Sequence, residues 1–245
     1  MTWIMFGAKQ LEYYDGLLIM ADTGLHAQVF SIVNDVKNKI KKENDLHVLD
    51  IASGEGAFSK RLSDNGFCVD SVDIDQENFK YHGSIPFRKM DLNDAQSWSD
   101  FLNQNKERYD MVVSMETVEH LENPWMFLRG LKELVKPGGY IVLSTPNIES
   151  PWSKFCFFLR NKFLMFMEGD LSYGHINPLT SFELKTIVHR IGLTHETTYP
   201  GGLYPLLWFK KGFANSIYWC LINILSLPFT ERLDYSWCKI YLIRK

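Results

Sequence analysis

The stretch VLDIASGEGAF, residues 48–58, decides the fold of this chain. The apolar run 47–52 predicts a buried parallel strand, and a helix is expected to begin near Ala57. Between them, Gly54 and Gly56 permit a tight turn whose backbone N–H groups can approach a ligand closely. A strand, a glycine turn and a helix in this order predict the first unit of an α/β fold, with a ligand site at the turn.

Strands and helices alternate along the rest of the chain. Asn123-Pro124 is typical of a helix start, and we expect that helix to run to Val135 and to stop at the sequence KPGG, residues 136–139. Thr180 and Glu183 form a capping box for another helix, which Gly192 ends. One further strand is expected to end with residues 69–75, and a short strand is expected directly before Met90-Asp91. Others are expected over 110–114, 140–144, 193–199 and 236–243. This alternation predicts a parallel sheet with right-handed crossovers.

Composition excludes several classes of protein. The 245 residues are 46% hydrophobic, and 26 basic side chains against 29 acidic ones give a net charge of -3. This balance argues against a disordered chain and against a dedicated nucleic-acid binder, so no nucleic-acid partner is expected. Four cysteines without a C-x-x-C pair and an N-terminus without a signal peptide indicate a cytoplasmic protein.

Acidic residues follow the predicted strands at positions where a nucleoside could be bound. Asp73 lies 17 positions after Gly56 and could accept hydrogen bonds from ribose hydroxyls, whereas Asp75 could equally be a solvated surface acid. Asp91 ends the next strand, where it could meet an adenine amino group. A nicotinamide site would want a third glycine where this chain has Ser59, which favours S-adenosylmethionine as the cofactor.

Residues 48–192 resemble the class I S-adenosylmethionine-dependent methyltransferases. The resemblance implies that Asp50, Gly54 and Gly56 line the methionine part of the cofactor, that Asp73 holds the ribose, and that Asp91 and Leu92 bracket the adenine. The other cofactor contacts that we expect are Ala52, Ser53, Phe58, Ile74, Ser114 and Met115. The family usually has glycine at the position of Ala52; if that position requires a positive φ, the side chain costs on the order of 1 kcal/mol. A catalytically silent relative acting as an interaction subunit is therefore the rival interpretation.

Residues 109–147 are similar to the ubiquinone-biosynthesis type of O-methyltransferase, which carries M-E-x-x-E-H after the fourth strand and K-P-G-G before the fifth. On a helical turn Glu116 would align with Glu119 and His120, and His175 lies in the downstream loop GHINPL. Two carboxylates and two imidazoles would suit Mg²⁺, Mn²⁺ or Zn²⁺, as in the small-RNA 2′-O-methyltransferases that the set resembles. Alternatively, His120 or His175 is a direct general base, or all four residues are structural. Because a hydroxyl acceptor must lose a proton, the two histidines favour O-methylation over N-methylation.

Aromatic residues are concentrated in the C-terminal part, with 16 in the first 150 positions and 19 in the last 95. Residues 151–167 and 203–229 combine them with basic residues, namely Lys154, Arg160, Lys162 and the pair Lys210-Lys211. Such segments suit a membrane interface, a dimer face or a lid over the acceptor pocket. The pattern also looks like methyltransferases of bacterial surface-polysaccharide synthesis. That likeness implies a sugar or lipid-linked glycan as acceptor, with a quinone or phenolic small molecule as the alternative.

Together these features predict an α/β fold, a Rossmann-like seven-stranded mixed sheet whose last strand is antiparallel, with helices on both faces. We expect an N-terminal helical cap over 1–44, a methyltransferase core over 45–199, an aromatic insertion over 200–235 and the final strand over 236–245.

Overall fold

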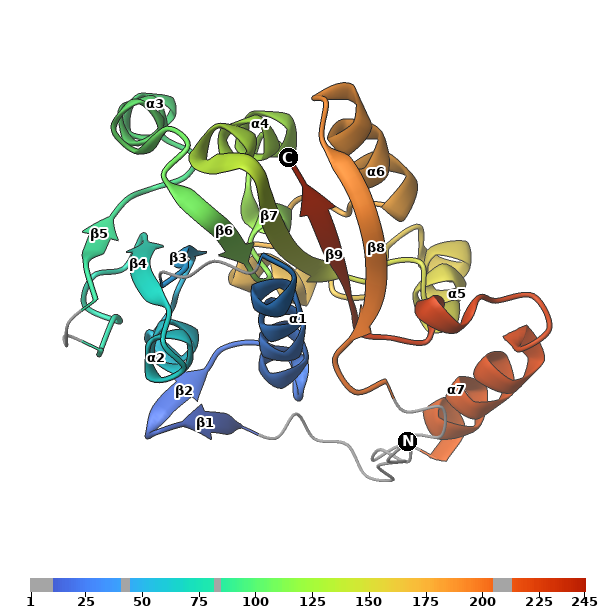
Figure 1. The fold of residues 1–245 in the computed structure, drawn as a ribbon. Coiled ribbons are helices and arrows are strands. Elements are labelled where there is room, and N and C mark those ends of the chain that lie inside the picture. Colours follow the sequence, from blue (N-terminus) through green and yellow to red (C-terminus); the bar gives the residue numbers. More distant parts are fainter. Residues whose placement is uncertain (1–10, 41–44, 82–84, 205–212) are drawn as a thin grey trace.

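The computed structural model describes residues 11–40, 45–81, 85–204 and 213–245, and a twisted sheet lies at its centre (Figure 1). Seven described strands pair in the order β5-β4-β3-β6-β7-β9-β8. Their bounds are β3 His47–Ile51, β4 Cys68–Asp73, β5 Phe87–Lys89, β6 Tyr109–Ser114, β7 Val135–Pro146, β8 Thr194–Gly201 and β9 Cys238–Arg244. Strand β9 is antiparallel to both of its neighbours, whereas the pairs from β5 to β7 are parallel. The predicted seven-stranded mixed sheet with an antiparallel last strand is confirmed.

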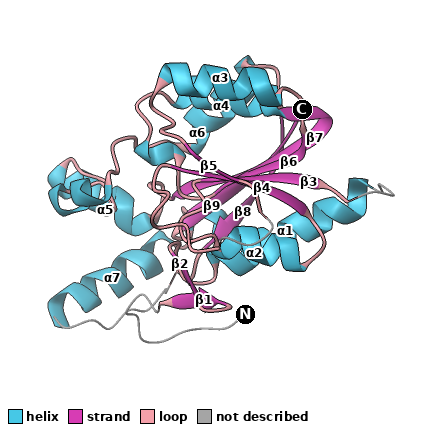
Figure 2. Ribbon diagram, turned by 90° about the vertical axis from the view of Figure 1, so that its left-hand side faces the viewer, coloured by secondary structure: helices cyan, strands magenta, loops and turns pink. Residues whose placement is uncertain are grey.

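Helices cover both faces of the sheet, as predicted (Figure 2). One face is covered by α1 (Leu25–Ile40) and α2 (Ala57–Asp64), and the other by α3 (Ala95–Asn105), α4 (Pro124–Leu134) and α6 (Ser181–Arg190). Successive strand residues point to opposite faces, so each strand supplies two cores. Val48 and Met111 pack with α1 and α2, whereas Leu49 and Val112 pack with α3, α4 and α6.

The predicted helix starts are present. The Asn123 side chain accepts a hydrogen bond from the Met126 N–H at 2.9 Å, and Thr180 Oγ1 accepts one from the Glu183 N–H at 3.0 Å. Each cap satisfies an N–H group that has no partner within the helix. At the other end of α6, Gly192 takes a left-handed φ of 75°.

We predicted that the KPGG sequence, residues 136–139, separates a helix from the next strand, and this prediction is wrong. Helix α4 ends at Leu134, and β7 already begins at Val135, which pairs with Tyr109 of β6. The next described pair is Met111 with Tyr140, so residues 136–139 lie in an irregularity of the strand. Gly138, with a φ of 78°, takes a left-handed conformation that glycine adopts at no steric cost.

The N-terminal region is not purely helical. Before α1, the strands β1 (Glu12–Tyr14) and β2 (Leu17–Ile19) form an antiparallel hairpin around the turn at Asp15 and Gly16. Residues 1–10 and 41–44 of the predicted helical cap lie outside the described residues. The expectation of helices throughout this region is wrong for the hairpin, because three-residue strands are too short to show a period in the sequence.

The aromatic segments form two neighbouring helices, α5 (Pro151–Arg160) and α7 (Phe213–Ser226), which contact each other. Short 3₁₀ turns lie at Val118–His120 (η1), Glu168–Tyr173 (η2) and Arg232–Asp234 (η3). Trp219 of α7 is buried against Trp152 of α5, with 5.0 Å between ring centroids, and also contacts Tyr204 and Trp237. Trp208, Lys210 and Lys211 lie outside the described residues.

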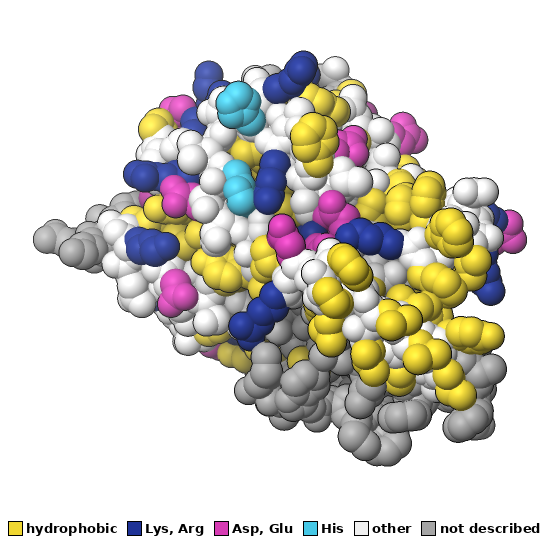
Figure 3. Space-filling view, turned by 90° about the vertical axis from the view of Figure 1, so that its right-hand side faces the viewer, with side chains coloured by type: hydrophobic (Ala, Val, Ile, Leu, Met, Phe, Trp, Pro, Cys, Tyr) yellow, Lys and Arg dark blue, Asp and Glu magenta, His cyan; other side chains and the backbone are white. Residues whose placement is uncertain are grey.

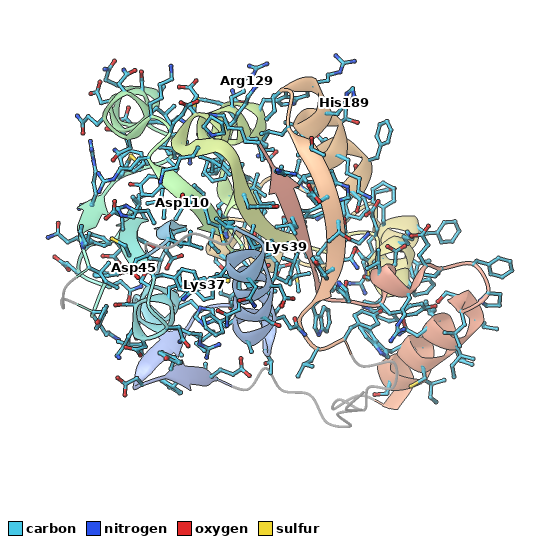
Figure 4. All side chains as sticks on the ribbon, in the orientation of Figure 1. Lys37, Lys39, Asp45, Asp110, Arg129 and His189 are labelled. Carbon is cyan, nitrogen blue, oxygen red and sulfur yellow. The ribbon has the colours of Figure 1, made fainter. Side chains whose placement is uncertain are left out.

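Structural ion pairs are found at the edge of the sheet where the parallel strands begin. Asp110, at the start of β6, accepts a hydrogen bond from the His47 N–H at 3.0 Å and pairs with Lys136 at 3.0 Å. Figure 4 labels Asp110 together with Asp45, which precedes β3, and Lys37 on the last turns of α1. The predicted site residues after β3, β4 and β6 lie at the other edge, where these strands end.

Strand order sets the position of the site. The chain passes from β3 to β4 and β5 on one side, and then returns to β6 and β7 on the other side of β3. The carboxyl ends of β3 and β6 therefore meet where the strand order reverses. In open α/β sheets, ligands bind in the crevice at this position.

Candidate cofactor and acceptor site

The turn after β3 is held open by left-handed backbone conformations. Gly54 and Gly56 have φ values of 55° and 86°. A Cβ atom on Gly56 would lie 2.7 Å from the Phe79 ring, so a larger residue does not fit there. The two glycines keep the backbone of the turn free of side chains, as the sequence predicts.

Ala52 also has a positive φ, of 60°. This residue stands where the resembling family usually has glycine, and the condition under which its side chain would cost stability is therefore met. The Ala52 N–H still donates to the Val72 carbonyl at 2.8 Å, so the turn keeps its connection to β4. The strain at Ala52 is therefore present in a turn that is still hydrogen-bonded to β4.

Asp73 at the end of β4 is joined to the glycine turn. Its Oδ2 accepts a hydrogen bond from the Gly54 N–H at 2.8 Å, and its Oδ1 accepts one from the Asp75 N–H at 2.9 Å. Asp75 accepts hydrogen bonds from the N–H groups of Glu77 and Asn78, which is a turn-forming role. The Asp73 carboxylate therefore lies at the glycine turn, whereas the Asp75 carboxylate stabilises the backbone of the next loop.

The predicted adenine contacts lie along the same edge. Ile74 is 58% exposed beside Asp73, so its side chain is accessible to a ligand. Asp91 is exposed after β5 and accepts a hydrogen bond from the Asn93 N–H at 2.9 Å, and Leu92 is buried beneath it. The exposed face of Ile74 could form one wall for a base.

Two predicted contacts of the turn point into the protein interior. Phe58 is buried and packs edge-on against His26 of α1, with ring centroids 4.8 Å apart. Asp50 is also buried, and its Oδ2 accepts a hydrogen bond from Ser59 Oγ at 2.6 Å. Burial, with Asp73 nearby, raises the pKa of Asp50 to about 7.

Six buried polar side-chain atoms lack a protein partner among the described residues; three lie on the helices α1, α2 and α3 (His26, Arg61 and Trp98), and three lie at the carboxyl ends of the strands. The three at the strand ends are Ser53 Oγ on the turn, Ser114 Oγ at the end of β6 and Glu119 Oε1 in η1. A buried polar group without a partner costs roughly 1–3 kcal/mol, and a bound ligand at the strand ends would remove that cost for these three atoms. All three are among the residues predicted from the sequence to contact the cofactor or a metal.

Glu119, His120 and His175 form a cluster beside this edge. Their ligand atoms lie within 4.8 Å of one another, and Nε2 of His120 is 3.9 Å from Oε1 of Glu119. The loop that carries His175 is fixed to η1 because the N–H groups of Ile176 and Asn177 donate to the Glu119 carbonyl at 3.0 and 2.9 Å. His175, which lies 55 positions after His120 in the sequence, is thus brought next to Glu119 and His120, as predicted.

The protonation of the cluster follows from burial. Burial raises the pKa of Glu119 well above its usual value, and Glu116 raises it further. Burial and the neighbouring His175 lower the pKa of His120, so this imidazole is neutral at pH 7. His175 Nδ1 lies 2.8 Å from the Met165 carbonyl, which can only accept, so Nδ1 carries a hydrogen and Nε2 is the ring nitrogen left for other partners.

Glu116 does not belong to this cluster. It has a positive φ of 51°, and η1 begins only at Val118, so the expected helical face shared by Glu116, Glu119 and His120 does not form. Its Oε1 instead accepts a hydrogen bond from the Cys238 thiol at 3.0 Å, and the same thiol lies 3.3 Å from Asp22 Oδ2. The structure therefore places Glu116 in a different group of possible ligands from the other three residues of the predicted metal set.

Glu119, His120 and His175 are the described residues of the predicted metal set that could hold an ion together. One carboxylate oxygen without a protein partner faces two imidazoles, and the hydrogen bond of His175 Nδ1 to a carbonyl is typical of histidine ligands. A second group of possible ligands, Asp22, Glu116 and Cys238, also lies within 4.8 Å. Sequence reasoning missed Asp22 and Cys238 because they are 216 positions apart and belong to no local motif.

The N-terminal hairpin covers the glycine turn, which the sequence also did not predict. Glu55 on the turn accepts a hydrogen bond from the Leu18 N–H at 2.8 Å and pairs with Lys80. A Cβ on Gly54 would lie 3.2 Å from Met20 Sδ, directly after β2.

A cavity of about 320 Å³ lies apart from these residues. Its lining is mostly basic and consists of Lys106, Arg129, Lys132, Glu133, Ile191 and Lys245. None of the predicted site residues lines it.

Comparisons with known proteins agree with this geometry. The model of the family described as "Methyltransferase domain" matches residues 25–198. The ubiquinone biosynthesis O-methyltransferase of Rickettsia typhi is 31% identical over 124 residues, which are 50% of this chain and 50% of that protein. The one from Coxiella burnetii is 30% identical over 123 residues, with 47% and 52% covered. The chain thus spans about half the length of these curated relatives.

Solved structures show the same fold. The SAM-dependent methyltransferase from Archaeoglobus fulgidus superposes with a TM-score of 0.57 at 20% identity, covering 89% of this chain and 94% of that one. The family model matches well over half of the chain and includes the glycine turn, Asp73, Asp91 and η1. The chain belongs to the methyltransferase domain family and has the fold of the class I S-adenosylmethionine-dependent methyltransferases.

Proposed function

We propose that this protein transfers a methyl group from S-adenosylmethionine to a hydroxyl group. The observation that carries the proposal is the position of Ser53 Oγ, Ser114 Oγ and Glu119 Oε1, three buried atoms without protein partners at the carboxyl ends of the strands. The glycine turn and Asp73 lie beside them, joined by the Gly54 hydrogen bond. Family membership and this arrangement both support S-adenosylmethionine as the cofactor.

For this reaction the protein must align the methyl donor with the acceptor hydroxyl and remove one proton. S-adenosylmethionine supplies an already activated methyl group, and transfer to a hydroxyl gives S-adenosylhomocysteine, a methyl ether and a proton. The protein must hold the reactants in line and accept that proton.

His175 is the base that the geometry favours. The Met165 carbonyl fixes its tautomer, so Nε2 is free to accept the hydroxyl proton. His120 packs against it with 4.8 Å between ring centroids and is kept neutral by burial.

A divalent ion is the alternative way to activate the hydroxyl. Glu119, His120 and His175 would hold it, and it would lower the pKa of the acceptor hydroxyl. The two routes differ in their response to chelation.

For the acceptor, we propose a sugar or lipid-linked glycan, which rests on the likeness of the basic and aromatic segment with GHINPL to polysaccharide-cluster methyltransferases. A quinone or phenolic acceptor is the second candidate, because the relatives that are about 30% identical are named ubiquinone biosynthesis O-methyltransferases. The alternative of a catalytically silent subunit is supported only by Ala52 and its strained turn.

The test is mass spectrometry of reaction mixtures containing S-adenosylmethionine and either lipid-linked glycan extracts or hydroxylated quinone precursors. We expect a product heavier by one methylene in one of the two mixtures. His175→Ala should lower kcat by about 10²–10⁴-fold, the usual contribution of a general base. His189→Ala is the matched control, because His189 is exposed at the far end of α6 (Figure 4).

Chelation separates the two routes of activation. Unchanged activity after chelation, together with loss in His175→Ala, assigns the proton to the histidine. Loss of activity on chelation, restored by Mg²⁺, Mn²⁺ or Zn²⁺, assigns activation to the ion. Full activity of His120→Ala, His175→Ala and Glu119→Gln would contradict both.

A further inference from the structure

The surface formed by α5, α7 and the turn after α7 is unusually apolar. Ten large hydrophobic side chains in these segments are exposed, which we call the α5–α7 patch: Phe157, Phe158, Leu159, Ile217, Tyr218, Leu221, Ile224, Leu225, Leu227 and Phe229. Phe158 is 80% exposed, Leu225 69% and Phe229 90%. Figure 3 shows hydrophobic side chains gathered on this side of the molecule. A contiguous apolar surface of this kind marks an interaction site.

The patch is a fixed surface. Trp219 on the inner side of α7 is buried against Trp152, and Asn223 on the same side donates to the Trp219 carbonyl and accepts from Tyr204. The inner side of α7 is therefore satisfied by the protein, and its outer side presents Leu221 and Leu225 at a spacing of one helical turn. Within the part of the chain that the structure describes, α7 therefore has one face packed on the protein and one face without a partner.

Charge indicates the kind of partner. Residues 213–230 contain no Asp, Glu, Lys or Arg, and the charged residues of 151–163 are all basic, namely Lys154, Arg160 and Lys162. Lys154 pairs with Asp234 and Lys162 with Glu168, whereas Arg160 is exposed at the end of α5, next to Phe158 and Leu159. An uncharged apolar face with the exposed Arg160 beside it matches the boundary between anionic lipid headgroups and acyl chains.

Length excludes a spanning mode for this helix. The 14 residues of α7 extend about 21 Å, shorter than the hydrocarbon core of a bilayer. Among the described residues, none of the helices has the length and hydropathy of a membrane span. A helix of this kind lies parallel to the membrane plane.

We propose that the α5–α7 patch binds the surface of a bilayer that contains anionic lipids. The aromatic and aliphatic side chains enter the interface, and Arg160 contacts the headgroups. This surface is connected to the histidine cluster: Phe157 stacks on Phe163 at 4.4 Å, and Phe166 lies 5.5 Å from His175. Binding would thus place the candidate acceptor site close to the lipid surface.

The test is flotation of the full chain with vesicles of phosphatidylcholine alone or of an equimolar mixture with phosphatidylglycerol. We expect the protein to float with the mixed vesicles and much less with the neutral ones. The double variant Phe158→Asp/Leu225→Asp should reduce the bound fraction at least tenfold, and Arg160→Glu should reduce it severalfold. Tyr13→Asp is the matched control, since it also places a charge on an exposed side chain, but in the N-terminal hairpin.

Because the substituted side chains are exposed, all variants should keep the thermal unfolding of the wild type, which is measured alongside. The proposal is overturned if the wild type stays with neither kind of vesicle, or if the double variant floats as the wild type does. It is also overturned if light scattering shows a dimer that the double variant dissociates while flotation is absent, because the patch would then bind a second copy. Flotation does not depend on methyl transfer, so this result and the proposed function are tested separately.

Discussion

Ala52 occupies a backbone conformation that glycine adopts at lower cost, with a φ of 60° in the turn that carries Gly54 and Gly56. We expect Ala52→Gly to raise the free energy of unfolding by about 1 kcal/mol, because it removes the steric conflict of the Cβ atom. Urea denaturation measures the change. Ala95→Gly, in the first turn of α3, is the matched control and should destabilise the protein, since glycine there only adds entropy to the unfolded chain. Equal destabilisation by both substitutions would contradict strain at Ala52.

Asp50 should make the protein less stable as the pH rises. Its pKa is raised from 3.8 to about 7 in the folded state by burial, so the folded protein binds the proton more tightly than the unfolded chain. The contribution of this group to stability is therefore full below pH 4 and is lost as the pH rises through 7. Asp50→Asn removes the titration, and the free energy of unfolding of the variant relative to wild type should increase by at least about 1 kcal/mol between pH 5 and pH 8.

The control for Asp50 is Asp100→Asn, an exposed substitution on α3. Its stability should follow that of the wild type at both pH values. A constant difference between Asp50→Asn and wild type from pH 5 to pH 8 would show that Asp50 does not titrate in this range.

Helices α3 and α4 pack so closely that one glycine is required between them. A Cβ atom on Gly130 of α4 would overlap the indole ring of Trp98, which is buried on α3. Gly130→Ala should therefore destabilise the protein by roughly 1–3 kcal/mol, as overpacking of a core does. Gly169→Ala, with no atom within 4 Å of the added Cβ, should change the free energy of unfolding by less than about 0.5 kcal/mol. Thermal unfolding of both variants decides the point, and similar melting temperatures would contradict the packing account.

The N-cap of α6 gives a second prediction for an element. Thr180→Ala removes the hydrogen bond to the Glu183 N–H and should cost about 1 kcal/mol. Thr186 on the same helix donates back to the Phe182 carbonyl at 2.7 Å, so Thr186→Ala should be neutral or slightly stabilising. Urea denaturation of the two variants distinguishes loss of the cap from loss of any threonine on this helix.

The elements that the sequence predicted are those with a local physical signal. The strands β3 and β6 show continuous apolar runs, and the helices that begin after Asn123 and Thr180 show side-chain caps. The hairpin before α1 was missed because its strands have three residues each. The bulge in β7 was missed because Pro137 and the two glycines after it are also the usual signals for the end of a helix.

At the scale of the whole molecule, the site combines residues that sequence reasoning could and could not assemble. Gly54, Asp73 and the Glu119-His120 pair belong to local motifs, and their meeting at one edge follows from parallel strands. The contact of Asp22 with Cys238 depends on how the two ends of the chain pack together. The contact of Met20 with the turn at Gly54 depends on how the N-terminal hairpin packs, and no local sequence pattern predicts either contact. The helical turn expected to align Glu116 with Glu119 and His120 does not form, because Glu116 takes a left-handed backbone conformation.

The concentration of aromatic residues in the C-terminal part of the chain is explained by two roles, packing and surface exposure. In the C-terminal part, Trp152, Trp219 and Trp237 form an inner cluster that attaches α7 to the core, whereas Phe158 and Phe229 are exposed on the outer surface. The same composition thus serves packing on one side of α7 and an interaction surface on the other.

Calorimetric titration with S-adenosylhomocysteine tests whether the carboxyl ends of β3, β4 and β6 bind the cofactor, as we propose. We predict saturable binding of one ligand per chain. Asp73→Ala should weaken this binding at least about tenfold, the effect of losing about 1.4 kcal/mol, while Asp75→Ala leaves it nearly unchanged. The absence of any binding heat from protein that unfolds cooperatively, or equal binding by wild type and Asp73→Ala, would contradict the assignment of the site.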